Sequence, residues 1–98
     1  MYVTVRRYEG VSDPREVARI ANEGFLPIIR EIEGFVDWYL VDAGDGVLMS
    51  TSIFESASGE EESNWRAGAF IGQHLTPLMP NPPHITAGVV IAHTATAK

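Results

Sequence analysis

The chain has 98 residues, 45% of them hydrophobic and 20% charged, which gives room for one domain with a modest core and excludes intrinsic disorder. Its net charge of -6, with 7 Lys and Arg residues scattered among 13 Asp and Glu, disfavours nucleic acid and membrane surfaces as partners, since both need a basic patch. Cysteine is absent, which excludes disulfides and thiolate metal sites, and with no targeting signal in view we expect one cytoplasmic domain over residues 1–98.

The first predicted element is a strand. The segment from Tyr2 to Glu9 alternates between two faces, with Thr4, Arg6 and Tyr8 on one of them. An arginine flanked by a hydroxyl and a phenol is suited to hold an enolate or a carboxylate. The alternative is an arginine at a strand end that pairs with an acid such as Asp37. Arg6 is therefore a candidate ligand-binding residue.

A helix follows this strand. Asp13 suits its cap and Pro14 its first position, and apolar residues then recur at helical spacing. Pro27 falls inside this pattern and removes one helix hydrogen bond. We therefore expect a kink near Gly24 and the end of the helix at Gly34.

Two strand-like runs, Phe35 to Val41 and Val47 to Phe54, are separated by turn residues around Asp45. This pattern predicts an antiparallel hairpin. Trp38 and Tyr39 are neighbours and must point to opposite faces of their strand, so one can line a pocket while the other contacts a second subunit. We take Trp38 as a candidate ligand contact.

A second helix and a last strand complete the predicted order. Ser58 and Glu61 form a capping pair for the helix, and Glu60 lies beside them at the end where the helix dipole favours acids. The helix should run to about Leu78, and the last strand should span His84 to His93.

The order β-α-β then β-α-β restricts the fold. Crossover connections are right-handed in nearly all proteins, so both helices should lie on the same face of a four-stranded antiparallel sheet, which is the ferredoxin-like α+β fold. The other face is then bare, although the strands are apolar on both sides. We therefore predict a homodimer in which two copies pack sheet against sheet.

The stretch "EGFVDWYLVDAGDGVLMSTSIFES", the helix with "ESNWRAGAFIGQHL" and the closing "ITAGVVIAH" resemble antibiotic biosynthesis monooxygenase-like members of the dimeric α/β barrel superfamily. The resemblance covers nearly the whole chain. It implies a dimer closed through its sheets and, in each subunit, a pocket between the sheet and the helices. That family includes oxygenases that use neither metal nor flavin and oxidise polyketide anthrones, haem-degrading enzymes, and members without known activity.

Helical spacing predicts one buried stripe on the second helix. At about 100° per residue the stripe consists of Ala67, Phe70, Ile71, His74 and Leu78. His74 should therefore face inward, either as a core histidine bonded to the sheet or as a pocket base that removes an acidic proton near pH 7. Phe70 is a candidate ligand contact. Asn64, at the edge of the stripe, is either a pocket group or solvated.

Trp65 does not share a face with His74, because the nine residues between their positions turn the helix by about half a revolution. We expect Trp65 on the surface or at a subunit contact. The resemblance implies that the haem-degrading members join a helix tryptophan and histidine to an asparagine on the first strand. That strand has no asparagine here, and haem degradation is a minor hypothesis.

The sequence favours a cofactor-independent monooxygenase-like protein that binds a small aromatic or polyketide-like molecule. His74 is the candidate catalytic residue, and Arg6, Trp38, Asn64 and Phe70 are the candidate ligand contacts. His84 and His93 lie on opposite faces and near opposite ends of their strand, so we expect no metal and no cofactor. The alternative is a non-catalytic dimer that binds a metabolite or is only structural.

Overall fold

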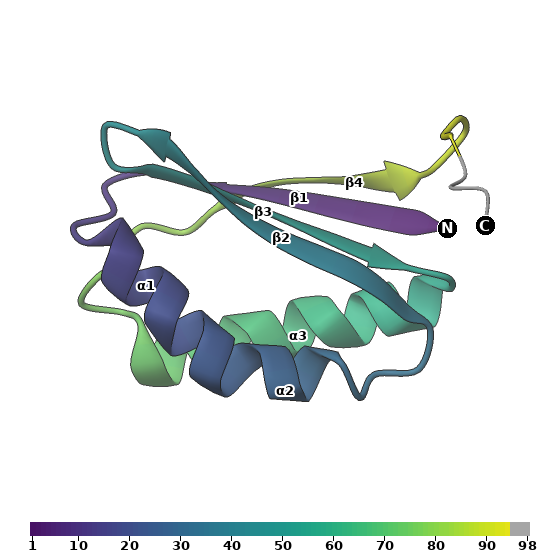
Figure 1. Cartoon of the computed structure of the whole chain (residues 1–98), viewed down its shortest axis with the longest axis horizontal. Coiled ribbons are helices and arrows are strands. Elements are labelled where there is room, and N and C mark those ends of the chain that lie inside the picture. The colour runs from purple at the N-terminus through teal and green to yellow at the C-terminus, as the bar shows by residue number, and fades with distance from the viewer. Residues whose placement is uncertain (95–98) are drawn as a thin grey trace.

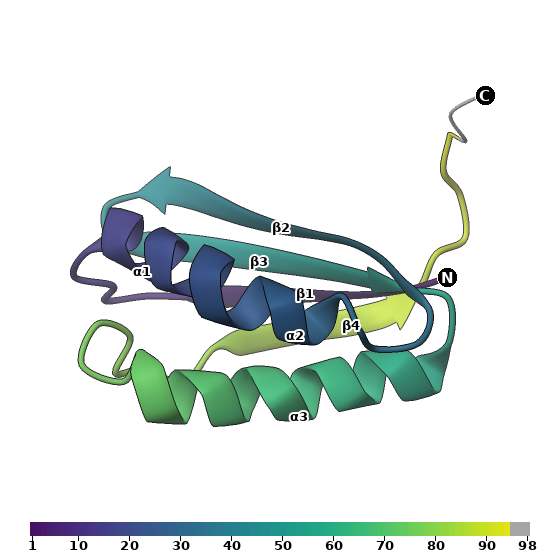
Figure 2. The same cartoon turned by 60° about the horizontal axis from the view of Figure 1, so that its bottom comes forward.

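One four-stranded antiparallel sheet carries all the helices on one of its faces in the computed structural model, which describes residues 1–94 (Figure 1, Figure 2). The strands lie in the order β2, β3, β1, β4. This confirms the predicted ferredoxin-like α+β fold. The strands are β1 (Tyr2–Tyr8), β2 (Phe35–Gly44), β3 (Val47–Phe54) and β4 (His84–Val89). The helices are α1 (Pro14–Ile20), the π-helical turn η1 (Ala21–Phe25), α2 (Leu26–Ile29) and α3 (Ala57–His74).

The first helical segment runs without a break from α1 through η1 to α2. The kink expected near Gly24 takes the form of the wider turn η1, which lies just before Pro27. Gly24 also faces the ring of Phe70 on α3, and a Cβ atom at this position would lie 2.8 Å from that ring. The glycine therefore allows the first helical segment and α3 to approach each other closely.

The boundaries of the two helical segments differ from the prediction at three points. The first segment ends at Ile29 and reaches Gly34 through a turn, whereas the sequence suggested a helix up to that glycine. The start of α3 is capped by Ser56, whose Oγ accepts from the N–H of Gly59 at 3.2 Å. The predicted cap Ser58 is wrong, because it lies inside the first helical turn.

The C-terminal end of α3 lies at His74 and not at about Leu78. Pro77 disfavours the helical conformation at the residue before it, Thr76. The Thr76 hydroxyl instead donates to the carbonyl groups of Ile71 and Gly72, both at 3.2 Å. These bonds satisfy carbonyl groups that the end of the helix leaves free.

The predicted hairpin between β2 and β3 is confirmed. Three residues at its turn have positive φ: Gly44 at 89°, Asp45 at 54° and Gly46 at 77°. A bulge near the start of β2 pairs Phe35 with Phe54. Phe35 therefore lies on the same face as Trp38, and not on the face of Tyr39 as simple alternation suggested.

The two faces of the sheet differ in their cover. Thr4, Arg6 and Tyr8 of β1 are buried beneath the helices, as the alternation predicted. On the open face, Tyr39 is 52% and Val41 48% exposed. The last strand, which ends at Val89 and not at His93, is exposed along its whole length, because α3 packs on β3 and β1.

Gly59 gives a test of the packing between α3 and the rest of the fold. A Cβ atom there would lie 2.7 Å from the backbone oxygen of Glu33 and 2.9 Å from the Phe54 ring, whereas one at Gly68 would meet nothing within 4 Å. We expect Gly59→Ala to lower the free energy of unfolding by about 1–3 kcal/mol through overpacking. Gly68→Ala should raise it by about 0.5–1 kcal/mol through helix propensity. Urea denaturation of both variants measures this, and equal effects would contradict the described packing.

Candidate functional site

A row of polar side chains is buried between the sheet and the helices, where a core of this size is normally apolar. Its members are Thr4, Arg6, Ser50, Ser52, Glu60 and Ser63. The register of the antiparallel β1–β3 pair places Ser50 opposite Arg6 and Ser52 opposite Thr4. Buried polar groups need hydrogen-bond partners, so the unpaired atoms in this row are informative.

Arg6 is the charged member of the row whose donors are only partly paired, while the Oγ atom of Ser63 also has no partner among the described residues. Its side chain is almost fully buried, and Nη1 donates to the Oγ atom of Ser52 at 3.1 Å. Nη2 is buried and has no partner among the described residues. The expected alternative partner, Asp37, instead accepts from the Tyr39 hydroxyl at 2.8 Å. Desolvation lowers the pKa of Arg6, while Tyr8 and Glu60 act in the opposite direction.

Glu60 was missed by the sequence analysis as a buried residue. Its carboxylate accepts from the hydroxyl of Thr4. The signal was present, because Glu60, Ser63 and Ala67 continue the buried stripe of α3 backward at spacings of three and four residues. The position of Glu60 in an acidic run at a helix start hid this pattern.

A cavity of about 40 Å³ lies between the sheet and the helices. Its polar wall comes from β1 and β3 and consists of Arg6, Tyr8 and Ser50. Its aromatic wall consists of Phe25, Trp38 and Phe70. The Phe25 ring centroid lies 5.8 Å from that of Trp38 and 5.5 Å from that of Phe70, so the three rings form one packed cluster. The cavity alone is small, with room for a few water molecules.

Beside the cavity lies a wider groove of about 410 Å³ between α3, β4 and the loop that joins them, hereafter the inner groove. The residues common to the two spaces are Arg6, Tyr8, Ala67, Ile71 and Met79. One wall of the inner groove is α3, through Asn64, Gly68 and Gly72, and the opposite wall includes Ile85 of β4. The Oδ1 atom of Asn64 is buried without a partner among the described residues. Arg6 therefore stands where a narrow aromatic cavity meets an open groove.

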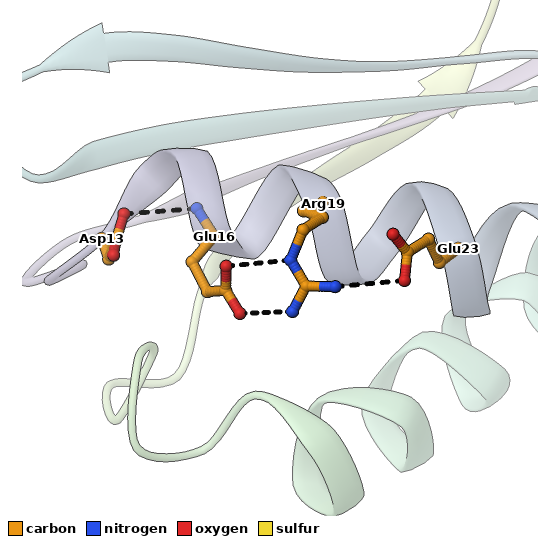
Figure 3. A network of polar contacts seen from close by, with 4 residues as sticks. All are labelled: Asp13, Glu16, Arg19 and Glu23. Atoms are coloured by element: carbon orange, nitrogen blue, oxygen red, sulfur yellow. Dashed lines mark hydrogen bonds and ion pairs between the residues drawn. The ribbon is translucent and has the colours of Figure 1, made fainter.

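A second groove, of about 640 Å³, lies on the outer side between the first helical segment and α3, hereafter the outer groove. It contains Arg19, whose donors are already paired with carboxylates (Figure 3). Nη2 and Nε bond to Glu16 at 2.5 and 3.0 Å, and Nη1 bonds to Glu23 at 3.1 Å. Each nitrogen of the Arg19 guanidinium thus bonds to a carboxylate, whereas Nη2 of Arg6 has no partner among the described residues.

Four of the five predicted site residues meet at the inner site. Arg6, Trp38 and Phe70 line the cavity, and Asn64 lines the inner groove. The inward orientation predicted for His74 is wrong, because His74 is exposed and lines the outer groove. The helix ends at this residue, and Leu75, which has left the helix, takes the buried position. The ring of His74 contacts the ring of Phe70, and the two ring centroids lie 4.7 Å apart.

Trp65 lies on the outside of α3 as predicted and is 74% exposed. Within residues 1–94 no cluster of three or more acidic or histidine side chains is arranged to hold a metal ion. In the same part of the chain no helix has the length and apolar character needed to cross a membrane.

Known proteins match this chain only through their structures, since no family model and no curated protein matches its sequence. A monooxygenase from the ActVA-Orf6 gene of Streptomyces coelicolor, in complex with nanaomycin D, matches with a TM-score of 0.75 at 19% identity, over 98% of this chain and 92% of that one. SnoaB, a cofactor-independent oxygenase from Streptomyces nogalater, matches with a TM-score of 0.64 at 16% identity, over 99% and 97% of the chains.

A third match is a dimeric ferredoxin-like protein from an uncultured marine organism, with a TM-score of 0.68 at 10% identity, over 98% of this chain and all (100%) of that one. The matches also include proteins of unknown function. At these identities the likeness shows the fold alone. The chain therefore has the ferredoxin-like fold that antibiotic biosynthesis monooxygenases share with dimeric proteins of other or unknown roles.

The titration of Tyr8 tests how well the inner site is shielded from water. Burial raises the pKa of its phenol above 10.0, although Arg6 and Ser50 act in the opposite direction. The unfolded chain then loses this proton first as the pH rises, so Tyr8 stabilises the fold below about pH 10 and that contribution is lost above it. We expect the free energy of unfolding to fall less steeply between about pH 8 and about pH 11 in Tyr8→Phe than in the wild type. Identical slopes in urea denaturation would show that the phenol is not shielded from water.

Proposed function

We propose that the chain is a cofactor-independent monooxygenase-like protein that binds a small aromatic or polyketide-like molecule in the cavity and the inner groove. The observation that carries this proposal is the Nη2 atom of Arg6, which is buried without a partner among the described residues, on a side chain that lines both spaces. A largely apolar pocket with a few converging polar groups is the usual form of a small-molecule site. The fold shared with SnoaB and the ActVA-Orf6 monooxygenase supports the same reading.

In this proposal the chain contributes binding, orientation and electrostatics. The flat ring system of the ligand contacts the wall of the inner groove, with one edge toward Trp38 and Phe70. The positive charge of Arg6, which lines both spaces, stabilises the negative charge that the ring gains when it loses a proton, and this favours the carbanion form that reacts with O₂. The inner groove gives this proton a path to solvent.

A second candidate function is non-catalytic binding of a small ligand. It is favoured by the residues that line the cavity, because Arg6 and Tyr8 are the only ionisable groups that residues 1–94 place there, and neither normally exchanges protons near pH 7. The catalytic role predicted for His74 requires contact with the ligand, yet this side chain lines the outer groove. Oxygen consumption separates the two candidates.

Gly68 offers a way to block the inner groove without disturbing the core, because a side chain there starts in open space. We expect Gly68→Leu to weaken binding of anthraquinone by about tenfold or more and to abolish any enzyme-dependent O₂ uptake with anthrone. Ala69→Leu, on the outer side of the same helix, is the matched control and should retain both. Trp65→Phe leaves Trp38 as the only tryptophan, so quenching of its fluorescence measures binding in all variants.

Each outcome of this experiment has a distinct meaning. Equal binding by Gly68→Leu and Ala69→Leu would contradict the inner groove as the site. Binding to the wild type without O₂ uptake above the spontaneous rate would favour the non-catalytic function. Loss of O₂ uptake in His74→Ala, with binding retained, would restore the predicted catalytic role of His74 from the outer groove.

We also propose that the chain forms a homodimer through the open face of the sheet. Tyr39 and Val41 are about half exposed there, and no helix of residues 1–94 covers them. Packing against a second copy removes this apolar surface from water. One matching structure is described as a dimeric ferredoxin-like protein, which supports the proposal.

Light scattering tests the dimer. The wild type should have about twice the chain mass of 10.7 kDa at micromolar concentration. Val41→Glu should shift the protein toward the monomer, because it places a charge in the apolar contact. Ala69→Glu, on the exposed side of α3, should leave the mass unchanged. A wild-type monomer at these concentrations would overturn the proposal.

A further inference from the structure

We propose that the inner site selects anionic ligands, specifically planar aromatic molecules that carry a carboxylate, and that the free Nη2 of Arg6 holds this group. The inference rests on the proposed function, because it assumes that a ligand occupies the inner groove. It adds the chemical class of that ligand. Three features of the described residues carry it.

The first feature is the incomplete pairing of a buried charge. A guanidinium has five N–H donors, and removing it from water is costly unless acceptors replace the water. Arg6 is 4% exposed, has Ser52 as its hydrogen-bond partner and leaves Nη2 without one. Glu60 attracts the guanidinium, but its carboxylate accepts from Thr4, and it forms no ion pair with Arg6 within residues 1–94.

The second feature is the charge of the walls. Among residues 1–94, Arg6 is the only charged residue that lines either the cavity or the inner groove. The whole chain has a net charge of -6, so a positive site without an acid on its wall is a local exception. A ligand carboxylate that enters the inner groove meets one cation and no facing anion, and the low dielectric of the site strengthens their attraction.

The third feature is the shape around the free donor. The planar guanidinium matches the two oxygens of a carboxylate better than a single carbonyl oxygen, and the pair is charge-assisted. Apolar groups flank the same point, with Ile71 and Met79 common to the cavity and the inner groove. An aromatic acid satisfies both requirements at once, since its ring contacts the apolar wall while its carboxylate reaches Arg6.

The outer groove provides an internal comparison. It also contains arginines, but Arg19 is bonded to Glu16 and Glu23, and Arg66 is paired with Glu62 at 2.8 Å. Both guanidinium groups are therefore neutralised by neighbouring carboxylates on the same helix. A ligand anion has no comparable free donor there, so the selection should belong to the inner site.

The experiment compares anthraquinone-2-carboxylate with its neutral amide, anthraquinone-2-carboxamide, which has the same ring system. Quenching of Trp38 fluorescence in the Trp65→Phe background measures both affinities. We expect the carboxylate to bind about tenfold or more tightly than the amide. Arg6→Met should remove this preference by weakening the carboxylate and leaving the amide unchanged, with thermal unfolding as the check that the variant is folded.

A second measurement needs no Arg6 variant. In NMR spectra of protein labelled with ¹⁵N-arginine, the carboxylate should shift a buried guanidinium signal strongly and the amide should not. Equal affinities for the two probes, or a preference that survives in Arg6→Met, would overturn the inference and leave the proposed function standing. Failure of both probes to bind would overturn both.

Discussion

The structure depends on one constraint: two helical segments, side by side in a single layer, must cover four strands from one face. α3 packs on β1 and β3, and the first helical segment packs beside α3, with Gly24 against Phe70. The outermost strand β4 therefore keeps its helix-side surface open, and Ile85 is 57% exposed there. The inner groove is the space that this incomplete cover leaves between α3 and β4. The loop between α3 and β4 completes the lining of this groove, through Thr76, Met79, Pro80, Asn81, Pro82 and Pro83.

The polar row beneath the helices gives this space its chemistry. In a small domain, each buried hydroxyl or charge replaces apolar contact that the fold could use for stability. Thr4 donates to Glu60 and Arg6 donates to Ser52, and the Nη2 atom of Arg6 has no partner among the described residues. A core selected for stability alone favours apolar residues of similar volume at such positions. The polar row therefore costs the fold some stability, which fits the proposed role of Arg6 in ligand binding.

Much of this arrangement follows from local patterns in the sequence. Alternation along β1 and β2 grouped Arg6 with Thr4 and Tyr8 and separated Trp38 from Tyr39, without showing which face the helices cover, and the turn residues around Asp45 predicted the hairpin. Periodicity failed for His74, because helical arithmetic cannot tell where α3 leaves the core, and Pro77 ends it early. It also missed Glu60, since an acid at a helix start is already explained by the dipole. The cavity itself depends on how residues far apart in the chain fill a common volume, which no local pattern records.

The close approach of Gly24 to the Phe70 ring links the size of the ligand site to the spacing of the helices. Phe70 forms part of the cavity on one side and contacts the π-helical turn on the other. A side chain larger than hydrogen at position 24 would force the Phe70 ring to shift, and so would change the shape of the cavity, although residue 24 does not line the cavity itself. The volume beside the polar row is therefore coupled to a position on the other side of Phe70, which lines the outer groove.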